Sequence, residues 1–455
     1  MATFKELREK YPVFTFDRYE VTEDENSFSV TYFFEIEQLA NFSPTWIFPK
    51  SKKIKTSLEN ETLQKLLFGL GMVELVSYWK LTCSPKIVVK AASLTEKQIN
   101  WWKDLYFHGL GEFFYVNGIQ TDLSSFVKIE AVGEDIKGIS EPRANKGTLI
   151  PVGGGKDSSV TMELLRESKK DNYCFAINPR GAVLWSVEAG GYQDKLLAVK
   201  RTLDPKMLLL NKEGFLNGHT PFSALVAFSS VITAFLHGLR YVALSNESSA
   251  NESTVPGSMV NHQYSKSFRF EKAFTEYEKE YADSGVSYYS LLRPLSEFQI
   301  AWYFAGCTQY HEVFRSCNAG SKTDSWCCNC PKCLFVFMIL SPFIELERLT
   351  QMFGENLLDK ESLTVTFEEL LGIREVKPFE CVGSREEVNT ALALFIKKRL
   401  EEKKTLPYLA QRYVDQKLYE KQIAKPNPYM SYYEQENLLP PEMDQMMRSI
   451  FLKEK

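Results

Sequence analysis

Residues 149–165, LIPVGGGKDSSVTMELL, form the stretch on which the interpretation of the whole chain depends. An apolar run over residues 149–152 predicts a strand, and the spacing of Val160, Leu164 and Leu165 predicts a helix after it. The turn between them contains Gly153, Gly154, Gly155, Lys156, Asp157 and Ser158. Glycines let the backbone approach a ligand with its N–H groups turned inward, and a helix N-terminus adds partial positive charge. The stretch therefore predicts a loop that binds phosphate or pyrophosphate.

This loop is not a Walker A loop, which needs a glycine, four further residues, and then Gly-Lys followed by Ser or Thr. Ile150 stands where the first glycine is required, and Asp157 stands where the Ser or Thr is required. A glycine-rich turn that binds no ligand is the alternative interpretation. The rest of the chain has to decide between the two.

The overall composition is that of an ordinary globular protein. The chain has 455 residues, enough for two or three domains, and a net charge of −4 at pH 7. This balance lacks the basic face that is typical of nucleic-acid-binding proteins, so we expect no nucleic-acid partner. Residues 222–239 are apolar but interrupted by polar side chains, and residues 334–344 are too few to span a bilayer. We expect both segments to be buried helices and no membrane contact.

Five of the nine cysteines lie between residues 317 and 333. Cys317, Cys327, Cys330 and Cys333 have the spacing C-x9-C-x2-C-x2-C, which suits four thiolates around a structural zinc ion. Cys328 could replace Cys327 as a ligand, and an iron–sulfur cluster or buried free thiols are the alternatives to zinc. A metal-binding pattern of this kind, with no apolar signal sequence at the N-terminus, predicts a cytoplasmic protein.

Three parts are predicted along the chain. Residues 1–135 predict a separate α+β domain. Residues 148–345 alternate between strands and helices, which predicts a parallel sheet with helices on both faces and ligands at the carboxyl ends of its strands. Residues 346–455 predict a helical, charged region. Its proline-containing segments at residues 425–428 and 439–442 predict an extended, polar C-terminal arm.

Polar segments at residues 218–221, 245–251 and 261–267 follow or flank the predicted strands. Their candidate functional residues are His219, Asn246, Glu247, His262 and Lys266. Helix caps and Asx turns would explain part of this composition. The number of ionisable side chains exceeds what capping needs, so we favour a functional site on these loops. The sheet rule predicts that at least the first two segments converge near the glycine loop.

Several motifs resemble those of known families. The glycine loop resembles the PP-loop of ATP pyrophosphatases, S-G-G-x-D-S, with Gly153 in place of the leading serine. The order of this loop, the Pro294-Leu295 turn and the four cysteines resembles 7-cyano-7-deazaguanine synthase, a PP-loop enzyme with similarly spaced zinc cysteines. Seven segments together resemble the UDP-N-acetylmuramoyl-L-alanyl-L-glutamate epimerase family (MurL), namely LIPVGGGKDS, NGHTPFSA, ALSNESSAN, NHQYSKS, LLRPLSE, SCN…WCCNCPKC and KPFECVG.

The resemblance to MurL implies a PP-loop (HUP-like) core with a Rossmann-type parallel sheet that carries an ATP site. It also implies the use of ATP and Mg²⁺, release of AMP and diphosphate, and inversion of the terminal L-glutamate of a UDP-muramyl dipeptide, which is a small-molecule substrate. Chemistry explains the need for ATP, because a carboxylate is a poor electron sink. An acyl adenylate would acidify the Cα–H, so that a base could remove this proton and an acid could return one to the opposite face.

Residue roles within this scheme are our hypotheses. The six residues of the glycine turn and Asn246 are expected to hold ATP, with Lys156 offsetting phosphate charge and Asp157 helping to hold Mg²⁺. The candidates for proton transfer are His219, Glu247, His262 and Lys266. Cys381 is a further candidate because a thiolate can take a Cα proton, although a buried structural cysteine is the favoured interpretation of this residue.

Two other functions are compatible with the same motifs. The chain could be another PP-loop adenylating enzyme, a nitrile-forming or amide-forming ligase of the deazaguanine synthase kind. From a different class, it could be a zinc-stabilised nucleotide-binding regulator without turnover. A ligase would require a nitrogen donor, and a regulator would release no diphosphate. The sequence predicts no oligomeric state.

Overall fold

The computed structural model describes residues 3–139, 145–251, 261–375 and 377–452, and in them eleven strands form one sheet. The strands are β1 (Val13–Glu23), β2 (Ser27–Ile36), β3 (Ala40–Phe42), β4 (Thr45–Pro49), β5 (Lys86–Val89), β6 (Lys128–Ala131), β7 (Thr148–Pro151), β8 (Asn172–Ile177), β9 (Leu196–Thr202), β10 (Tyr241–Leu244) and β11 (Ser287–Ser290). Their order is β11-β10-β7-β8-β9-β4-β2-β1-β5-β6, and β3 pairs with β2. The molecule is thus a mixed α/β protein with a large central sheet.

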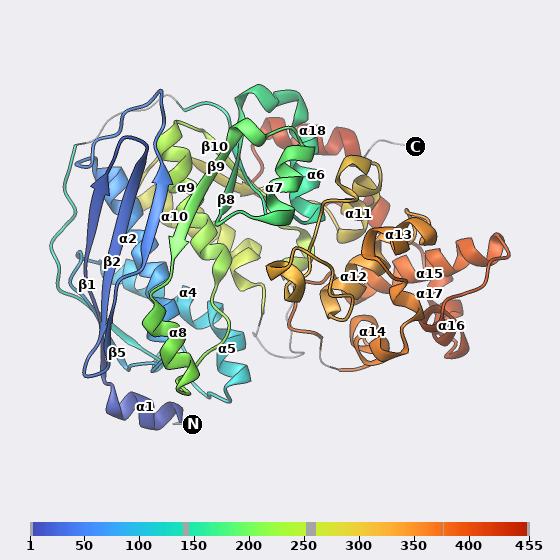
Figure 1. The fold of residues 1–455 in the computed structure, drawn as a ribbon, viewed down its shortest axis with the longest axis horizontal. Coiled ribbons are helices and arrows are strands. Elements are labelled where there is room, and N and C mark those ends of the chain that lie inside the picture. Colours follow the sequence, from blue (N-terminus) through green and yellow to red (C-terminus); the bar gives the residue numbers. More distant parts are fainter. Residues whose placement is uncertain (1–2, 140–144, 252–260, 376, 453–455) are drawn as a thin grey trace.

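Helices cover the sheet and form most of the C-terminal part of the molecule (Figure 1). The first nine are α1 (Phe4–Lys10), α2 (Glu61–Glu74), α3 (Val76–Trp79), α4 (Glu96–Gly109), α5 (Gly111–Val116), α6 (Lys156–Leu164), α7 (Gly181–Ala189), α8 (Pro205–Lys212) and α9 (Phe222–His237). The others are α10 (Phe268–Tyr281), α11 (Glu297–Ala305), α12 (Pro331–Leu340), α13 (Leu346–Phe353), α14 (Thr364–Leu371), α15 (Arg385–Glu401), α16 (Tyr408–Asp415), α17 (Leu418–Ile423) and α18 (Pro441–Phe451).

The strands from β7 to β11 all pair in parallel with one another, as the sequence predicts. Their spatial order is β9-β8-β7-β10-β11, so the chain enters in the middle, moves to one side and then crosses to the other. The direction of this progression reverses between β7 and β10. In open α/β sheets, ligands bind at such a reversal, outside the carboxyl ends of the strands. The glycine loop leaves β7 at this position.

The N-terminal strands continue the same sheet, because β4 pairs antiparallel with β9. A buried ion pair stabilises this junction: Arg201 of β9 donates to the Glu74 carboxylate at 2.9 Å, and the Trp46 indole donates to it at 3.0 Å. Glu74 has no exposed surface, so loss of its cationic partner would leave an uncompensated buried charge. Residues 1–135 therefore share a sheet and a hydrophobic core with the parallel strands, and a domain boundary near residue 135 stays a prediction.

The predicted extended C-terminal arm is wrong for residues 441–451, which form α18. Pro441 occupies the first turn of this helix, where a missing N–H is tolerated, so the two prolines start a helix here instead of preventing one. Met447 and Phe451 are buried against the second hydrophobic core. The phenol of Tyr241 at the start of β10 also donates to Glu442 at 2.7 Å. The C-terminal residues therefore return to the parallel sheet.

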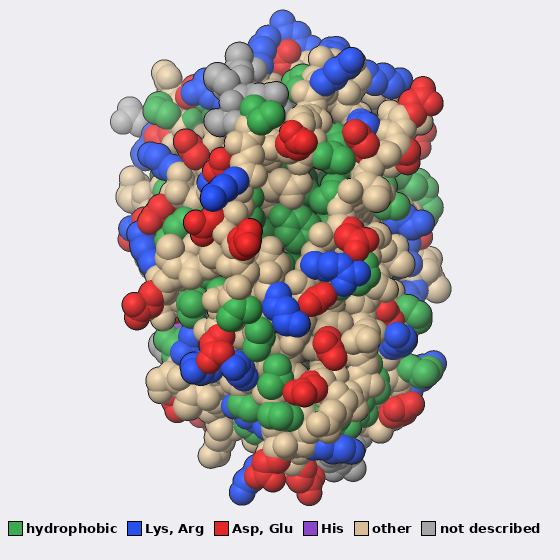
Figure 2. All heavy atoms as spheres, turned by 90° about the vertical axis from the view of Figure 1, so that its left-hand side faces the viewer, with side chains coloured by type: hydrophobic (Ala, Val, Ile, Leu, Met, Phe, Trp, Pro, Cys, Tyr) green, Lys and Arg blue, Asp and Glu red, His purple; other side chains and the backbone are tan. Residues whose placement is uncertain are grey.

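Both apolar segments of the sequence are buried helices, α9 and α12, as predicted. No helix within the described ranges has the length and apolar character needed to cross a membrane. On the side of the molecule formed by β1 and β2, basic and acidic side chains are interspersed (Figure 2). Arg18, for example, pairs with both Asp17 and Glu20 on β1. This face therefore carries mixed charge of both signs.

Candidate active site

The glycine loop connects the end of β7 to the first turn of α6. Gly154 has φ +79°, and a Cβ atom at this position would lie 2.9 Å from the main chain of α7, so a side chain would be both strained and obstructed. Its carbonyl accepts a hydrogen bond from the Arg315 N–H at 2.8 Å. A Cβ atom at Gly153, in contrast, would meet nothing within 4 Å. The loop thus packs tightly on one side and is open on the other.

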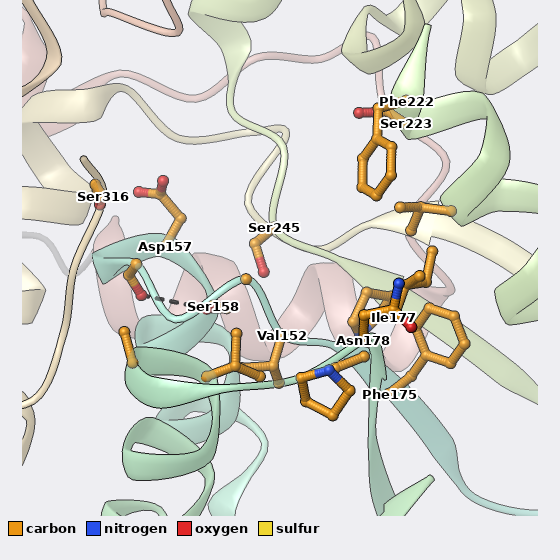
Figure 3. Close-up of a pocket in the computed structure, with 18 of the residues that line it drawn as sticks. Val152, Asp157, Ser158, Phe175, Ile177, Asn178, Phe222, Ser223, Ser245 and Ser316 are labelled. Atoms are coloured by element: carbon orange, nitrogen blue, oxygen red, sulfur yellow. Dashed lines mark hydrogen bonds between the residues drawn. The ribbon is translucent and has the colours of Figure 1, made fainter. Parts of the chain in front are cut away.

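The open side faces a cavity of about 1080 Å³. Five of the predicted ATP-site residues line it, namely Gly153, Gly155, Asp157, Ser158 and Asn246. Figure 3 shows a polar end of this cavity at Asp157, Ser158 and Ser316, and an apolar end at Phe175, Ile177 and Phe222. Phe175 and Ile177 belong to the second half of β8, and Phe222 is the first residue of α9. The cavity thus lies along the carboxyl edge of the parallel strands.

Lys156 lies beneath the loop and has no exposed surface. Its ammonium contacts the carboxylates of both Asp157 and Glu297. Burial alone would lower the pKa of Lys156, but these two carboxylates raise it above its ordinary value, so the lysine stays charged. Burial raises the pKa of Glu297 to about 8. Lys156 therefore holds the Asp157 side chain at the cavity wall, and this carboxylate-bearing side chain is 25% exposed.

A second group of ionisable side chains gathers around Glu112 of α5. The Nδ1 atom of His262 contacts the Glu112 carboxylate, and Nδ1 of His219 lies 3.3 Å from the same group. Burial lowers the pKa of His219 to about 4. Burial would also lower the pKa of His262, but Cys381 and Glu112 outweigh it and raise the value to about 9. The two histidines, which look alike in sequence, therefore differ in charge at neutral pH.

Lys266 and Cys381 connect this group to the cavity, since both line it. The ammonium of Lys266 donates to the Cys381 sulfur at 3.1 Å. Of the other proton-transfer candidates, His219, Glu247 and His262 are not among the described residues that line the cavity. The main-chain oxygen of Glu247 accepts a hydrogen bond from the buried Arg293 at 2.6 Å, which fixes the loop after β10.

The four predicted metal ligands come together. Their sulfur atoms all lie within 4.8 Å of one another, with distances of 3.9 Å between Cys317 and Cys330 and 3.8 Å between Cys327 and Cys333. Zinc–sulfur bonds of about 2.3 Å in a tetrahedron require sulfur atoms about 3.8 Å apart, so the group fits zinc. The Cys328 sulfur points elsewhere and lies 3.3 Å from the Phe353 carbonyl oxygen. Cys327 is therefore the residue that completes the set.

The cysteine site also positions the cavity wall. Cys317 and Asn318 line the cavity directly after Arg315 and Ser316. Two main-chain N–H groups, those of Gly320 and Cys327, donate to the Cys317 sulfur at 3.1 and 3.4 Å and fix its position. A metal ion in this site would hold residues 315–318 against the glycine loop.

Three residues of the site were not among the sequence candidates. Glu112 lies in the N-terminal part, which carries no motif. Glu297 follows the Pro-Leu turn, and Lys332 lies between two of the predicted metal ligands. Lys332 lines the cavity, and its ammonium contacts the main-chain oxygen of Cys381. A lysine between metal-ligand cysteines was the signal that could have been used.

Comparison with known proteins identifies the family. The MurL N-terminal domain model matches residues 5–291, and the MurL C-terminal domain model matches residues 313–424. The chain belongs to the MurL family. The MurL N-terminal match covers both the N-terminal strands and the parallel strands, and the MurL C-terminal match begins just before the cysteine site. No solved structure matches the chain.

MurL proteins from three bacteria are similar to this chain, and each is named UDP-N-acetyl-alpha-D-muramoyl-L-alanyl-L-glutamate epimerase. The protein of Xanthomonas oryzae pv. oryzae is 36% identical over 340 residues, which are 73% of this chain and 74% of the relative. Those of Salinispora tropica and a Micromonospora species are each 38% identical over 339 residues, or 73% of this chain and 73% and 75% of the relatives.

Proposed function

We propose that this protein is an epimerase that converts the terminal L-glutamate of UDP-N-acetylmuramoyl-L-alanyl-L-glutamate to D-glutamate in an ATP-dependent reaction. The names of the relatives support the epimerase activity and the substrate. The observation that supports ATP dependence is the position of the glycine loop at the strand-order reversal, where it is open on one side to a cavity of about 1080 Å³. We further propose that this part of the sheet is a PP-loop core of the Rossmann type, and its strand order and glycine loop support this proposal.

In this proposal the nucleotide lies along the cavity. The N–H groups of residues 153–158, at the N-terminus of α6, receive phosphate oxygens. The adenine packs against the apolar end of the cavity, where Phe175, Ile177 and Phe222 offer flat or branched apolar surface. Lys266 and Lys332 supply positive charge at the polar end. The same end receives the glutamate carboxylate, which has to approach the α-phosphate in order to form the acyl adenylate.

The cavity offers one side-chain oxygen ligand that suits a magnesium ion. The Asp157 carboxylate faces the cavity, and hard oxygen ligands of this kind, together with phosphate oxygens and water, suit Mg²⁺. The buried Lys156 fixes the orientation of this carboxylate and prevents its protonation, since the lysine lowers the pKa of Asp157 against the effect of burial. When bound, Mg²⁺ would offset negative charge on the phosphates. The four cysteines would hold a structural zinc ion.

Adenylation turns the glutamate carboxylate into a mixed anhydride with the α-phosphate of AMP. Its acyl carbonyl carries no charge and can accept electron density from Cα. The proton-transfer step then needs a base at one face of Cα and a proton for the other. Lys266 cannot be this base at neutral pH, because the nearby Cys381 and Glu247 outweigh burial and raise its pKa above the ordinary value. We assign it the electrostatic role of stabilising the enolate that forms. We place the reaction in a reducing, cytoplasmic compartment, and nine cysteines without a disulfide among them support this placement.

The experiment that tests this function uses the purified full chain, ATP, Mg²⁺ and the UDP-muramyl dipeptide, without any nitrogen donor. Chiral chromatography of the glutamate released by acid hydrolysis measures inversion, and AMP and diphosphate are measured in parallel. We expect D-glutamate together with AMP and diphosphate. A requirement for ammonia would favour a ligase, and the absence of diphosphate would favour a regulator without turnover.

A further inference from the structure

Cys381 lies where the cavity meets side chains from three distant parts of the chain. Its side chain lines the cavity, the Lys266 ammonium lies 3.1 Å from its sulfur, and the Lys332 ammonium contacts its main-chain oxygen. A cysteine that serves only to fill space has apolar neighbours, as Cys174 does beside the sulfur of Met162. The surroundings of Cys381 are instead cationic and open to a site for a ligand.

A series of ionisable groups continues from this thiol away from the cavity. His262 lies near enough to Cys381 to lower the pKa of the thiol, and its Nδ1 atom contacts the carboxylate of Glu112. Thiol, imidazole and carboxylate thus occur in the order in which a reactive cysteine, its partner and an orienting group are arranged in enzymes. The Glu112 carboxylate is 17% exposed and the His262 imidazole is 14% exposed, so both groups are shielded from water.

The charges around Cys381 favour a thiolate. Burial raises the pKa of a thiol, but Lys266, His262 and Lys332 outweigh it and lower the pKa of Cys381 to about 6. Cys307, whose sulfur donates to the Tyr303 carbonyl, shows the opposite effect, because burial raises its pKa to about 12. The other ionisable groups that act on this cluster are Asp157, Glu247, Glu380 and His219. Near neutral pH the cluster therefore contains a thiolate beside three cationic side chains, those of Lys266, His262 and Lys332.

We propose that Cys381 is the base that removes the Cα proton of the adenylated glutamate, and that His262 and Glu112 are positioning residues that keep its sulfur ionised and directed into the cavity. This inference rests on the proposed function, and it replaces the structural role that the sequence alone favoured for this cysteine.

In the proton removal, the lone pair of the Cys381 sulfur takes the Cα proton, so that an S–H bond forms and the Cα–H bond breaks. The electron pair of the Cα–H bond moves into the carbonyl group of the acyl adenylate and gives an enolate, whose charge the Lys266 ammonium stabilises. A proton from water adds to the opposite face of Cα, and the thiol returns its proton to water. Nothing is oxidised or reduced.

Cys381→Ala tests the assignment, with Cys307→Ala as the matched control. Each full-length variant is incubated with ATP, Mg²⁺ and the UDP-muramyl dipeptide in deuterium oxide. Two rates are measured, namely exchange of labelled diphosphate into ATP and incorporation of deuterium at Cα. We expect Cys381→Ala to keep diphosphate exchange and to lose about 10³-fold in deuterium incorporation, because a positioned base contributes on this scale. The control is expected to keep both rates.

The two rates separate the inference from the function on which it rests. If wild-type protein exchanges no diphosphate, the proposed function fails whatever Cys381 does. If wild-type protein exchanges diphosphate and Cys381→Ala incorporates deuterium at the wild-type rate, Cys381 is not the base. A variant that does not fold is replaced by alkylation of the wild-type protein with iodoacetamide. Modification of Cys381 with a midpoint near pH 6 supports the thiolate, and a midpoint above pH 8 contradicts it.

The positioning role of Glu112 has its own readout. The substitution Glu112→Gln removes an anion that keeps His262 protonated. The neutral imidazole then no longer favours the Cys381 thiolate. The midpoint of Cys381 alkylation is then expected to rise by roughly one pH unit, and Glu112→Asp is expected to restore it. An unchanged midpoint overturns this role. Metal analysis gives a further outcome that overturns it: an ion lost with Glu112→Gln would mean that His262 binds a metal and carries no proton.

Discussion

The two ends of the proposed reaction site differ in how the sequence encodes them. The glycine loop is contiguous, and residues 153–158 contain its whole sequence pattern. The proton-transfer end combines Glu112, His262, Lys266 and Cys381 from segments up to 269 residues apart, the difference between positions 381 and 112. A contiguous loop tolerates changes elsewhere in the fold, whereas an assembled cluster depends on every element that supports it. The predictions below test this difference.

The largest expected effect is at Gly154. Replacement by valine would place a β-branched side chain at φ +79° and within 3 Å of the α7 main chain. Strain of about 1–2 kcal/mol from the left-handed conformation adds to the steric overlap. We expect diphosphate exchange to fall by more than about 10²-fold, because misplaced phosphate contacts reduce positioning strongly. Gly306→Ala is the control, since its Cβ would lie 3.5 Å from the nearest atom.

The second effect is on the metal site, which supports the loop from outside. Cys330→Ser is expected to abolish metal binding and to lower the free energy of unfolding by several kcal/mol, because structural zinc binding is coupled to folding. Cys328→Ser is the matched control, since its sulfur points away from the other four. Metal content by mass spectrometry and thermal unfolding measure the result. Equal metal loss in both variants would contradict the assignment of Cys327 as the fourth ligand.

The pH dependence tests the assembled end. The pKa of Cys381 is lowered to about 6 and that of His262 is raised to about 9. Below the lower value the thiolate is protonated and cannot accept the Cα proton, and above the upper value the imidazolium is lost. We expect deuterium incorporation to rise through about pH 6 and to decline through about pH 9, while diphosphate exchange does not follow the same limits. A profile without the acidic limit would contradict the thiolate.

The smallest effect distinguishes the two histidines. His219→Ala is expected to reduce deuterium incorporation less than about tenfold, because burial keeps this imidazole neutral and it is His262 that lowers the pKa of Cys381. His262→Ala is expected to cost at least ten times more than His219→Ala. Equal losses in the two variants would mean that both imidazoles act together, and the order Cys381, His262, Glu112 would have to be revised.

The features that could be predicted from the sequence are the local ones, such as the contiguous loop, and not the assembled cluster. The strand-loop-helix unit, the alternation that gives the parallel sheet and the four cysteines could all be predicted, because each is a local pattern of spacing and composition. The neighbours of Cys381 could not be predicted, since no local signal links it to Lys266. The C-terminal prolines were misinterpreted because a Pro-Pro pair also fits the first turn of a helix.

Lys156 shows why even a correct motif leaves the chemistry open. From the sequence its ammonium was expected at the phosphates, yet the structure places it under the loop, between Asp157 and Glu297. The position of its ammonium depends on Glu297, which lies 141 residues further along the chain. Tertiary partners of this kind cannot be obtained from spacing, so the backbone of the loop was predictable and the direction of its side chains was not.

The most direct test of the account is a single incubation of the full chain with ATP, Mg²⁺ and UDP-N-acetylmuramoyl-L-alanyl-L-glutamate in deuterium oxide, followed by chiral separation and mass spectrometry of the glutamate. The account predicts D-glutamate that carries one deuterium at Cα and is formed only when ATP is present. Inversion without ATP, or ATP cleavage without deuterium at Cα, would contradict it.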